Sequence, residues 1–278
     1  MTQPFFSVII PALNEERFIS KLLSSLAKQT YRDYEVILVD GKSNDKTVEI
    51  FKKFTQKYPR QNILVSDKKN VAHQRNLGAK QACGRYLIFL DADVEFGDTF
   101  LEEIHLSAVK KKFKLATTYT SPDSKKEIDQ IMMVLSNLAL EAAKIINKPF
   151  TGGFNTIVDR ETFLKIKGYR EDLLISEDHD FAMRAYRNNI ETVILPEPKI
   201  TNSMRRFRSE GTLSVLRKYS YSIIYTLLKG PITHKLFEYK MGGDAHRKRR
   251  KKIDLMKINT YIKAIGELES KINKMIGE

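Results

Sequence analysis

Residues 86–93 read YLIFLDAD, an unbroken apolar run that ends directly in two carboxylates. Short apolar runs rich in β-branched and aromatic residues predict buried β-strands. Similar runs precede it at residues 5–10 (FFSVII), 34–39 (YEVILV) and 63–66. Because continuous apolar strands are typical of a sheet covered on both faces, we expect a buried parallel sheet.

Segments with apolar residues at helical spacing separate these runs. We expect helices at residues 15–28, 46–57 and 70–82, each lying between two strands. Strands that alternate with helices of this length indicate βαβ units. Residues 1–95 therefore predict the nucleotide-binding half of an α/β domain, with a Rossmann-like, doubly wound, mostly parallel sheet.

The order of elements becomes less regular after residue 98. We expect helices near residues 99–111, 128–146, 161–166 and 178–188, and strands near residues 115–120 and 192–195. A glycine-loosened loop at residues 151–158 runs into a further strand. We assign residues 96–200 to an acceptor half, so that residues 1–200 form one catalytic domain.

Basic residues concentrate at the end of the chain. The 278 residues carry a formal net charge of +14, and 11 of these surplus charges fall in residues 201–278. This part predicts a basic helical C-terminal extension, with a charge run HRKRRKK at residues 246–252 and a helix at residues 253–276. A helix at residues 213–228, with cations beside its apolar face, suits either a membrane interface or packing on the catalytic domain. A basic segment beside a nearly neutral domain predicts contact with an anionic surface, such as a membrane leaflet.

Cysteine usage and hydropathy indicate the compartment. Cys83 is the single cysteine, the N-terminal residues show no signal-peptide pattern, and no run approaches the roughly 20 apolar residues of a spanning helix. We expect a cytoplasmic enzyme that lies peripherally on the inner face of the cell membrane.

Polar residues follow each predicted strand, at the edge where parallel sheets bind ligands. They are Pro11, Ala12, Asn14 and Glu15 after the first strand, Asp40 after the second, Asp67 after the third, and Asp91 and Asp93 after the fourth. The last pair suits a divalent metal, Mn²⁺ or Mg²⁺, that bridges two phosphate oxygens, although a plain turn is the alternative. The chain has no Cys and His cluster of the kind that zinc favours.

Five motifs in this order resemble the family-2 glycosyltransferases of the GT-A fold. They are SVIIPALNEE at residues 7–16, VILVDGKSNDKT at 36–47, HQRNLGA at 73–79, YLIFLDAD at 86–93 and SEDHDFAMRA at 176–185. The resemblance implies a GT-A fold, a UDP- or GDP-sugar donor and inverting transfer. It also implies that Asp40 holds the nucleobase, that residues 11–15 and Arg75 line the nucleoside pocket, and that Asp91 and Asp93 reach the ribose and the metal, with Asp93 as the direct ligand.

The resemblance also assigns residues in the second half of the chain. Glu177 and Asp178 match the acidic pair that supplies the catalytic base, and Asp178 is the first choice because a carboxylate can take the proton of the attacking hydroxyl. Gly152 and Gly153 are expected beside the donor sugar and acceptor, although a simple turn also explains them. Arg205 and Arg206 lie in a polar segment where relatives carry a mobile basic loop, so phosphate contact is expected. Asp180 and Arg184 have the spacing of a helix ion pair.

The resemblance implies an acceptor such as a polyprenyl phosphate or a lipid-linked glycan. Transfer of a single sugar is favoured because the Q-x-x-R-W motif of the processive synthases is absent. A nucleotidyltransferase for sugar phosphates is one alternative, but it usually carries a glycine-rich basic loop where this chain has PALNEE. A nucleic-acid-binding protein is the other alternative. The acidic strand ends would repel the phosphate backbone of a nucleic acid, so no nucleic-acid partner is expected.

Overall fold

The structure is a computed structural model in which residues 3–237 and 242–243 are described. These residues belong to one compact unit, Met1–Arg247, and a second unit comprises Lys248–Glu278. The HRKRRKK run and the predicted helix at residues 253–276 lie outside the described residues. The predicted division of the chain at residue 200 stays a prediction.

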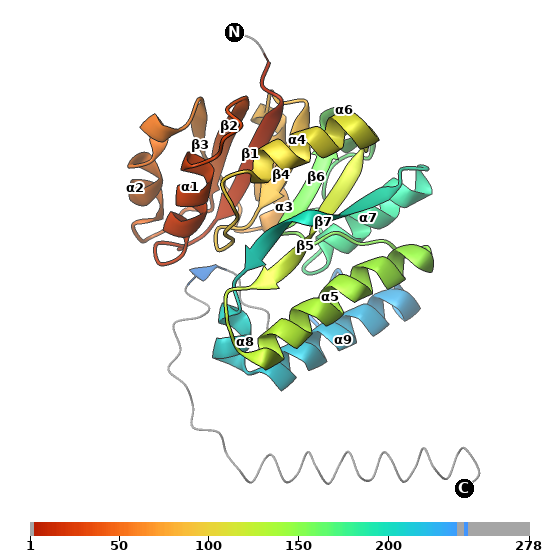
Figure 1. The fold of residues 1–278 in the computed structure, drawn as a ribbon. Helices are drawn as coiled ribbons and strands as arrows, with labels where there is room; N and C mark the ends of the chain where they lie inside the picture. The colour runs from red at the N-terminus through yellow and green to blue at the C-terminus, as the bar shows by residue number, and fades with distance from the viewer. Residues whose placement is uncertain (1–2, 238–241, 244–278) are drawn as a thin grey trace, which may run out of the picture. The chain divides into compact units, whose positions relative to one another are not determined.

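A seven-stranded sheet forms the centre of the first unit, in the order β3-β2-β1-β4-β6-β5-β7 (Figure 1). The strands are β1 (Phe6–Ala12), β2 (Tyr34–Asp40), β3 (Gln61–Val65), β4 (Tyr86–Leu90), β5 (Leu115–Pro122), β6 (Asn155–Asp159) and β7 (Thr192–Asn202). β6 runs antiparallel to β4 and β5, and all other neighbouring strands are parallel. The predicted mostly parallel α/β sheet is confirmed.

Helices cover both faces of this sheet. They are α1 (Ile19–Ala27), α2 (Thr47–Lys52), α3 (Val71–Gln81), α4 (Phe100–Lys111), α5 (Glu127–Ile145), α6 (Arg160–Lys165), α7 (Glu177–Arg187), α8 (Arg205–Glu210) and α9 (Thr212–Lys229), with a 3₁₀ turn at Thr55–Lys57. One core cluster joins α1, α2 and α4 to the sheet, and a second cluster joins α3, α6 and α7 to its other face. Neighbouring strand residues such as Ile9 and Ile10 therefore point into different cores.

The edge strand β3 differs from the expectation of strands buried on both faces. None of its residues is fully buried, and Val65 is largely exposed. An edge strand has a partner on one side only, so less of its surface is covered.

Several element boundaries differ from the sequence prediction, and the second helix, for example, ends at Lys52 instead of residue 57. The first helix begins at Ile19 instead of residue 15, because residues 16–18 form a turn that ends at Phe18, which has a non-helical φ of −120°. β7 extends to Asn202, well beyond the predicted end at residue 195. The segment expected to be a basic loop forms helix α8, which Gly211, with a φ of 87°, separates from α9.

None of the helices in residues 3–237 combines the length and hydropathy that crossing a bilayer requires.

Candidate active site

The loops that follow β1 and β2 are hydrogen-bonded to each other. The two strands are in register to their ends, so that Ala12 is opposite Asp40. Asn14 donates its backbone N–H to the Ser43 hydroxyl at 2.9 Å and accepts the backbone N–H of Asn44 at 2.8 Å. Asn14 has a positive φ, and its side-chain oxygen contacts this neighbouring loop. The predicted nucleoside residues of these two strand ends therefore lie together.

Asp40 is buried, and half of its carboxylate lacks a partner. Its Oδ2 accepts the backbone N–H of Ser43 at 3.1 Å, whereas its Oδ1 is buried without a hydrogen bond. Beside it, the Gln74 amide donates to the carbonyl oxygens of Ala12 and Val39, both at 3.0 Å, and so joins β1 to β2. Because buried acceptors are almost always satisfied, a ligand N–H fits the remaining oxygen of Asp40.

Arg75 joins the end of β4 to the start of α7. Only 2 % of its surface is exposed, and its guanidinium donates to Asp91 at 2.9 Å and to Glu177 at 2.6 Å. It also lies 5.4 Å from the centre of the Tyr169 ring. Charge-assisted bonds at both ends of one buried guanidinium fix these two acidic motifs relative to each other. Two carboxylates thus hold Arg75 in place. Its contact with the nucleoside stays a prediction.

Gly153 lies against the Arg75 guanidinium. A Cβ at residue 153 would stand 2.9 Å from Nη2 of Arg75, so a larger residue would force the arginine to move. Gly152 forms an isolated bridge with Asn155 at the start of β6. Gly153 therefore lies beside the acidic motifs, where close backbone approach is needed, and Gly152 precedes it in the same loop.

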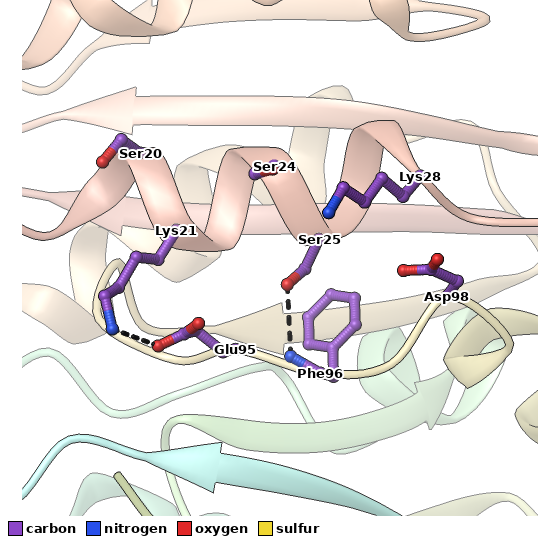
Figure 2. A pocket seen from close by; sticks show the side chains of 8 residues that line it. All are labelled: Ser20, Lys21, Ser24, Ser25, Lys28, Glu95, Phe96 and Asp98. Atoms are coloured by element: carbon purple, nitrogen blue, oxygen red, sulfur yellow. Dashed lines mark hydrogen bonds and ion pairs between the residues drawn. The ribbon is translucent and has the colours of Figure 1, made fainter.

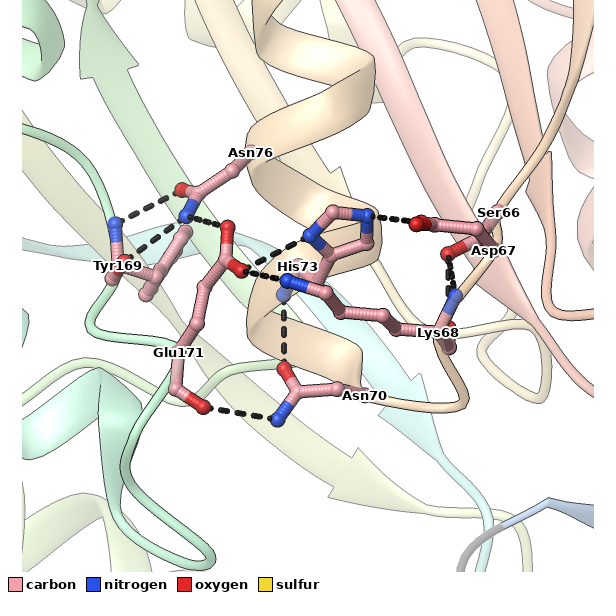
Figure 3. Close-up of polar contacts among 8 residues, drawn as sticks. All are labelled: Ser66, Asp67, Lys68, Asn70, His73, Asn76, Tyr169 and Glu171. Carbon is pink, nitrogen blue, oxygen red and sulfur yellow. Dashed lines mark hydrogen bonds and ion pairs between the residues drawn. The ribbon is translucent and has the colours of Figure 1, made fainter.

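A hydrogen-bond network around His73 holds α3, the helix that carries Gln74 and Arg75 (Figure 3). The two His73 ring nitrogens lie 2.8 Å from Asp67 and 2.9 Å from Glu171, and Asn70 caps the helix by accepting the His73 backbone N–H at 2.8 Å. The strand-end residue Asp67 therefore belongs to this network. Its contacts tie the start of α3 to residues 169–171 and so fix the position of Arg75.

Arg205 lies between Glu15 and Asp93. Its Nη atoms donate to both oxygens of Glu15 at 2.5 and 3.0 Å, and its Nε is 2.7 Å from Oδ2 of Asp93. Burial raises the pKa of Glu15 to about 7 and that of Asp93 to about 6, despite this cation. The guanidinium also packs 4.4 Å from the centre of the Phe18 ring. An arginine from α8 thus occupies the acidic end of β1 and β4.

The donor set at this position fits a divalent cation that is shared with a phosphate ligand. Asp91 and Asp93 supply hard carboxylate oxygens, and Asp93 already faces a positive charge. In the described part of the chain, no three acidic, histidine or cysteine side chains converge on a complete metal cage. Magnesium-type sites commonly combine one or two carboxylates with phosphate oxygens and water, so the residues present fit that mode.

The start of α7 holds the predicted base. Oδ2 of Asp178 accepts the backbone N–H of Gly153 at 2.8 Å, and its Oδ1 accepts the N–H of His179 at the same distance. Burial and the neighbouring Asp178 raise the pKa of Glu177, whose carboxylate is paired with Arg75.

The other residues discussed on α7 have structural contacts. The predicted pair of Asp180 and Arg184 is confirmed at 2.7 Å. His179 stacks on Phe150, with ring centres 4.6 Å apart.

The sequence reading missed two contributors to this region. Gln74 joins β1 to β2, and Gly243 donates its backbone N–H to the carbonyl oxygen of Leu13 at 3.0 Å. Gly242 has a φ of 79° and lies so close to Leu13 that a Cβ would stand 2.6 Å from its carbonyl oxygen. The Gly-Gly dipeptide in an otherwise basic segment was the available signal for this close approach.

One cavity lies away from these residues. It has a volume of about 340 Å³ and lies between α1 and residues 95–98, with Lys21 paired to Glu95 and Ser25 bonded to the Phe96 backbone (Figure 2). None of the predicted site residues lines it. We assign the chemistry to the strand ends, where Arg205 itself fills the space between Glu15 and Asp93.

Comparison with curated proteins gives relatives that are glycosyltransferases. TarS of Staphylococcus aureus, a poly(ribitol-phosphate) β-N-acetylglucosaminyltransferase, is 30 % identical over 66 % of this chain and 32 % of its own length. A Methanococcus voltae enzyme is 31 % identical over 57 % of this chain and 49 % of its own length. It is named dolichyl N-acetyl-α-D-glucosaminyl phosphate 3-β-D-2,3-diacetamido-2,3-dideoxy-β-D-glucuronosyltransferase. The chain thus spans about a third to a half of these relatives.

Solved structures share the GT-A fold. A TarS fragment, residues 1–349, in complex with UDP-GlcNAc superposes with a TM-score of 0.59 at 23 % identity, over 71 % of this chain and 58 % of that one. The mannosyltransferase PcManGT of Pyrobaculum calidifontis, with GDP-Man and Mn²⁺, gives 0.60 at 19 % identity, over 80 % and 65 %. Residues 7–167 match the model of glycosyl transferase family 2, more than half of the sequence. The chain belongs to glycosyl transferase family 2.

Proposed function

We propose that this chain is an inverting glycosyltransferase that moves one sugar from a nucleoside-diphosphate sugar to an acceptor hydroxyl. The observation that carries the proposal is the linkage of the two acidic motifs through buried Arg75, which contacts both Asp91 and Glu177. A donor-binding carboxylate pair and a candidate base are thereby held at one site. Such fixed geometry is what a single displacement requires.

The free oxygen of Asp40 supports nucleobase binding. Uracil and guanine each present a ring N–H, which a buried carboxylate oxygen without a partner can accept. The solved relatives bind UDP, UDP-GlcNAc or GDP-Man, so both bases are represented among similar folds. We therefore propose a UDP- or GDP-sugar donor, with residues 11–15 beside the nucleoside.

Asp93, together with Asp91, would hold Mn²⁺ or Mg²⁺ on the donor diphosphate. The metal would supply neutralisation of the charge that grows on the leaving diphosphate. Arg205 and Arg206 provide further positive charge on the same side of the site, because Arg205 contacts Asp93 and Arg206 lies near enough to lower the pKa of that carboxyl. We propose that Arg205 exchanges its carboxylate partners for phosphate oxygens when the donor binds.

Asp178 is the proposed general base. The Gly153 and His179 N–H groups orient its carboxylate, which would take the proton of the acceptor hydroxyl as that oxygen attacks the anomeric carbon. The bond from the anomeric carbon to the diphosphate oxygen breaks on the opposite face, so the configuration inverts. Gly152 and Gly153 leave room for the donor sugar beside this carboxylate.

A lipid-linked acceptor at the inner face of the cell membrane is the proposed setting. The Methanococcus relative is named for a dolichyl-linked substrate, and 11 surplus positive charges follow residue 200. Basic residues near an anionic leaflet are each worth about 1 kcal/mol. In this proposal residues 1–200 catalyse transfer, and the basic extension holds the enzyme peripherally at the surface.

The identity of the released product tests the proposal. Incubation with UDP- and GDP-sugars, Mn²⁺ and polyprenyl phosphate should release nucleoside diphosphate and give a product of inverted anomeric configuration by nuclear magnetic resonance. Release of pyrophosphate from a sugar phosphate and a nucleoside triphosphate would instead favour the nucleotidyltransferase. Retention of configuration would reject Asp178 as the base of a single displacement.

A further inference from the structure

Helix α5 carries a broad apolar face that points away from the sheet. Its large aliphatic side chains are more than half exposed: Ile128 and Ile131 at 54 %, Val134 at 57 %, Leu135 at 59 %, Leu138 at 57 % and Ile145 at 79 %. Apolar residues recur at spacings of three and four along the helix, which places them on one side. An exposed run of this size on a helix is a mark of an interaction site.

The opposite side of α5 is anchored to β5. The Asn137 amide bonds both the N–H and the carbonyl of Thr120, at 3.0 and 2.9 Å. The Tyr119 hydroxyl donates to Glu141 at 2.8 Å, and Met133 is buried. These contacts fix the rotation of the helix, so its apolar face cannot turn inward without breaking them.

The exposed charges that flank this face are mostly positive, and Glu127 in the first turn is the exposed acidic residue among them. No charged residue occurs from residue 130 to residue 140, while Lys125 and Lys126 are exposed before the helix and Lys148 is exposed after it. Apolar side chains between terminal lysines are typical of helices that lie in the plane of a membrane interface. The lysine stems can extend toward lipid phosphates while the centre of the helix is buried.

A second copy of the chain fits this face less well. Stable protein interfaces use roughly 20–30 residues a side, far more than one face of a 19-residue helix provides. An anionic membrane surface imposes no such size requirement, because lipid headgroups can surround a single exposed helix.

Both ends of α5 lead into the candidate site. The chain passes from Ile145 to Gly152 and Gly153, and Gly153 bonds the proposed base Asp178. Before the helix, Asp123 pairs with Arg208 at 2.7 Å, in the same helix α8 that carries Arg205. A surface that binds along α5 would thus lie next to segments that contact the reacting groups.

We propose that the apolar face of α5 inserts into the headgroup region of an anionic membrane and brings the site to a lipid-linked acceptor. The proposal rests on the proposed function for its acceptor, but membrane binding itself can be measured without any substrate. It deepens that function by assigning membrane contact to a surface inside the catalytic domain.

Flotation of the full-length chain with vesicles of phosphatidylcholine and phosphatidylglycerol tests the assignment. The variant Ile131→Gln/Leu135→Gln/Leu138→Gln removes the centre of the face. The matched control Val65→Gln/Leu106→Gln/Val109→Gln changes side chains that are as exposed, at 64, 61 and 56 %, on β3 and α4. At about 1 M salt, where charges are screened within about 3 Å, binding should persist for wild type and control. It should fall at least about tenfold for the α5 variant, because apolar burial drives it.

Two outcomes would overturn the assignment. Equal high-salt binding by the α5 variant and the control would show that the face does not contact lipid. If the α5 variant loses a dimer that light scattering detects for the wild type, and its vesicle binding is unchanged, the face is assigned to a second copy of the chain. The proposed function is tested separately. It fails if the vesicle-bound wild type, given donor and Mn²⁺, transfers no sugar to a lipid acceptor, even though the α5 variant loses vesicle binding as expected.

Discussion

The Nε atom of Arg205 lies 2.7 Å from Oδ2 of Asp93, so the chain places its own cation on the proposed metal ligand. The same guanidinium pairs with Glu15, which draws together the ends of β1 and β4 and helix α8. A metal–donor complex that enters this position must compete with an internal positive charge. The effect of Arg205 on metal binding can therefore be measured.

Replacing Arg205 should separate metal binding from donor binding. In Arg205→Gln we expect tighter binding of Mn²⁺ alone, because Asp93 loses its competing cation, and weaker binding of the nucleotide sugar, because a phosphate contact is lost. Electron paramagnetic resonance can measure free Mn²⁺, and calorimetry can measure donor affinity. Arg208→Gln is the control, since Arg208 pairs with Asp123. An unchanged Mn²⁺ affinity in Arg205→Gln would contradict the competition.

Asp93→Ala should abolish metal-dependent transfer with little effect on folding. Arg205 keeps its bidentate pair with Glu15 in this variant, so the guanidinium is not left unpaired. Thermal unfolding should lose the stabilisation that Mn²⁺ and donor together give the wild type. Full turnover of the variant in excess chelator would reject the metal assignment.

Asp178→Asn should keep donor binding and lose transfer by about 10² to 10⁴-fold, the usual contribution of general-base catalysis. The amide oxygen can still accept the Gly153 N–H, but it cannot take a proton from the acceptor. Asp180→Asn is the matched control on the same helix, because Asp180 pairs with Arg184. A loss of activity of no more than about threefold would be well below the usual general-base contribution, and it would assign the role of the base to Glu177.

Asp40→Asn should weaken binding of UDP and GDP by about tenfold or more, since a hydrogen bond to a charged group contributes about 1.5–3 kcal/mol. The amide can still accept the Ser43 N–H, while its NH₂ group replaces the oxygen that has no partner. The free energy of unfolding should change little by comparison. Equal nucleotide affinities in wild type and Asp40→Asn would place the base elsewhere.

Deletion of residues 244–278 should reduce binding to anionic vesicles at low salt and leave donor affinity intact. The deleted part holds the HRKRRKK run, whereas the contact of Gly243 with Leu13 beside the nucleoside loop is retained. Attraction between these basic residues and anionic lipid is screened by salt. If the full-length chain shows no preference for anionic over neutral vesicles at low salt, a soluble acceptor is favoured.

The sequence predicted the sheet and the positions of its polar ends. Runs such as YLIFL at residues 86–90 are long enough and apolar enough to form buried strands, and the helices between them require parallel pairing. Asp40 and the pair of Asp91 and Asp93 follow from the same pattern, since Asp40 is the last residue of β2 and Asp91 comes directly after β4. Boundaries were less accurate, because the backbone before α1 depends on contacts with distant residues: the Glu15 N–H donates to Thr47 and the Glu16 N–H donates to Asp45.

What the sequence by itself determined is local: which residues form strands and helices, and which carboxylates stand at strand ends. The tertiary structure decided which of them meet, because a contact such as Arg205 with Asp93 joins residues far apart in the chain. It also decided which side of α5 is exposed. Met133 and Leu135 are both apolar, yet only Met133 is buried, because Asn137 and Glu141 attach the other side of the helix to β5.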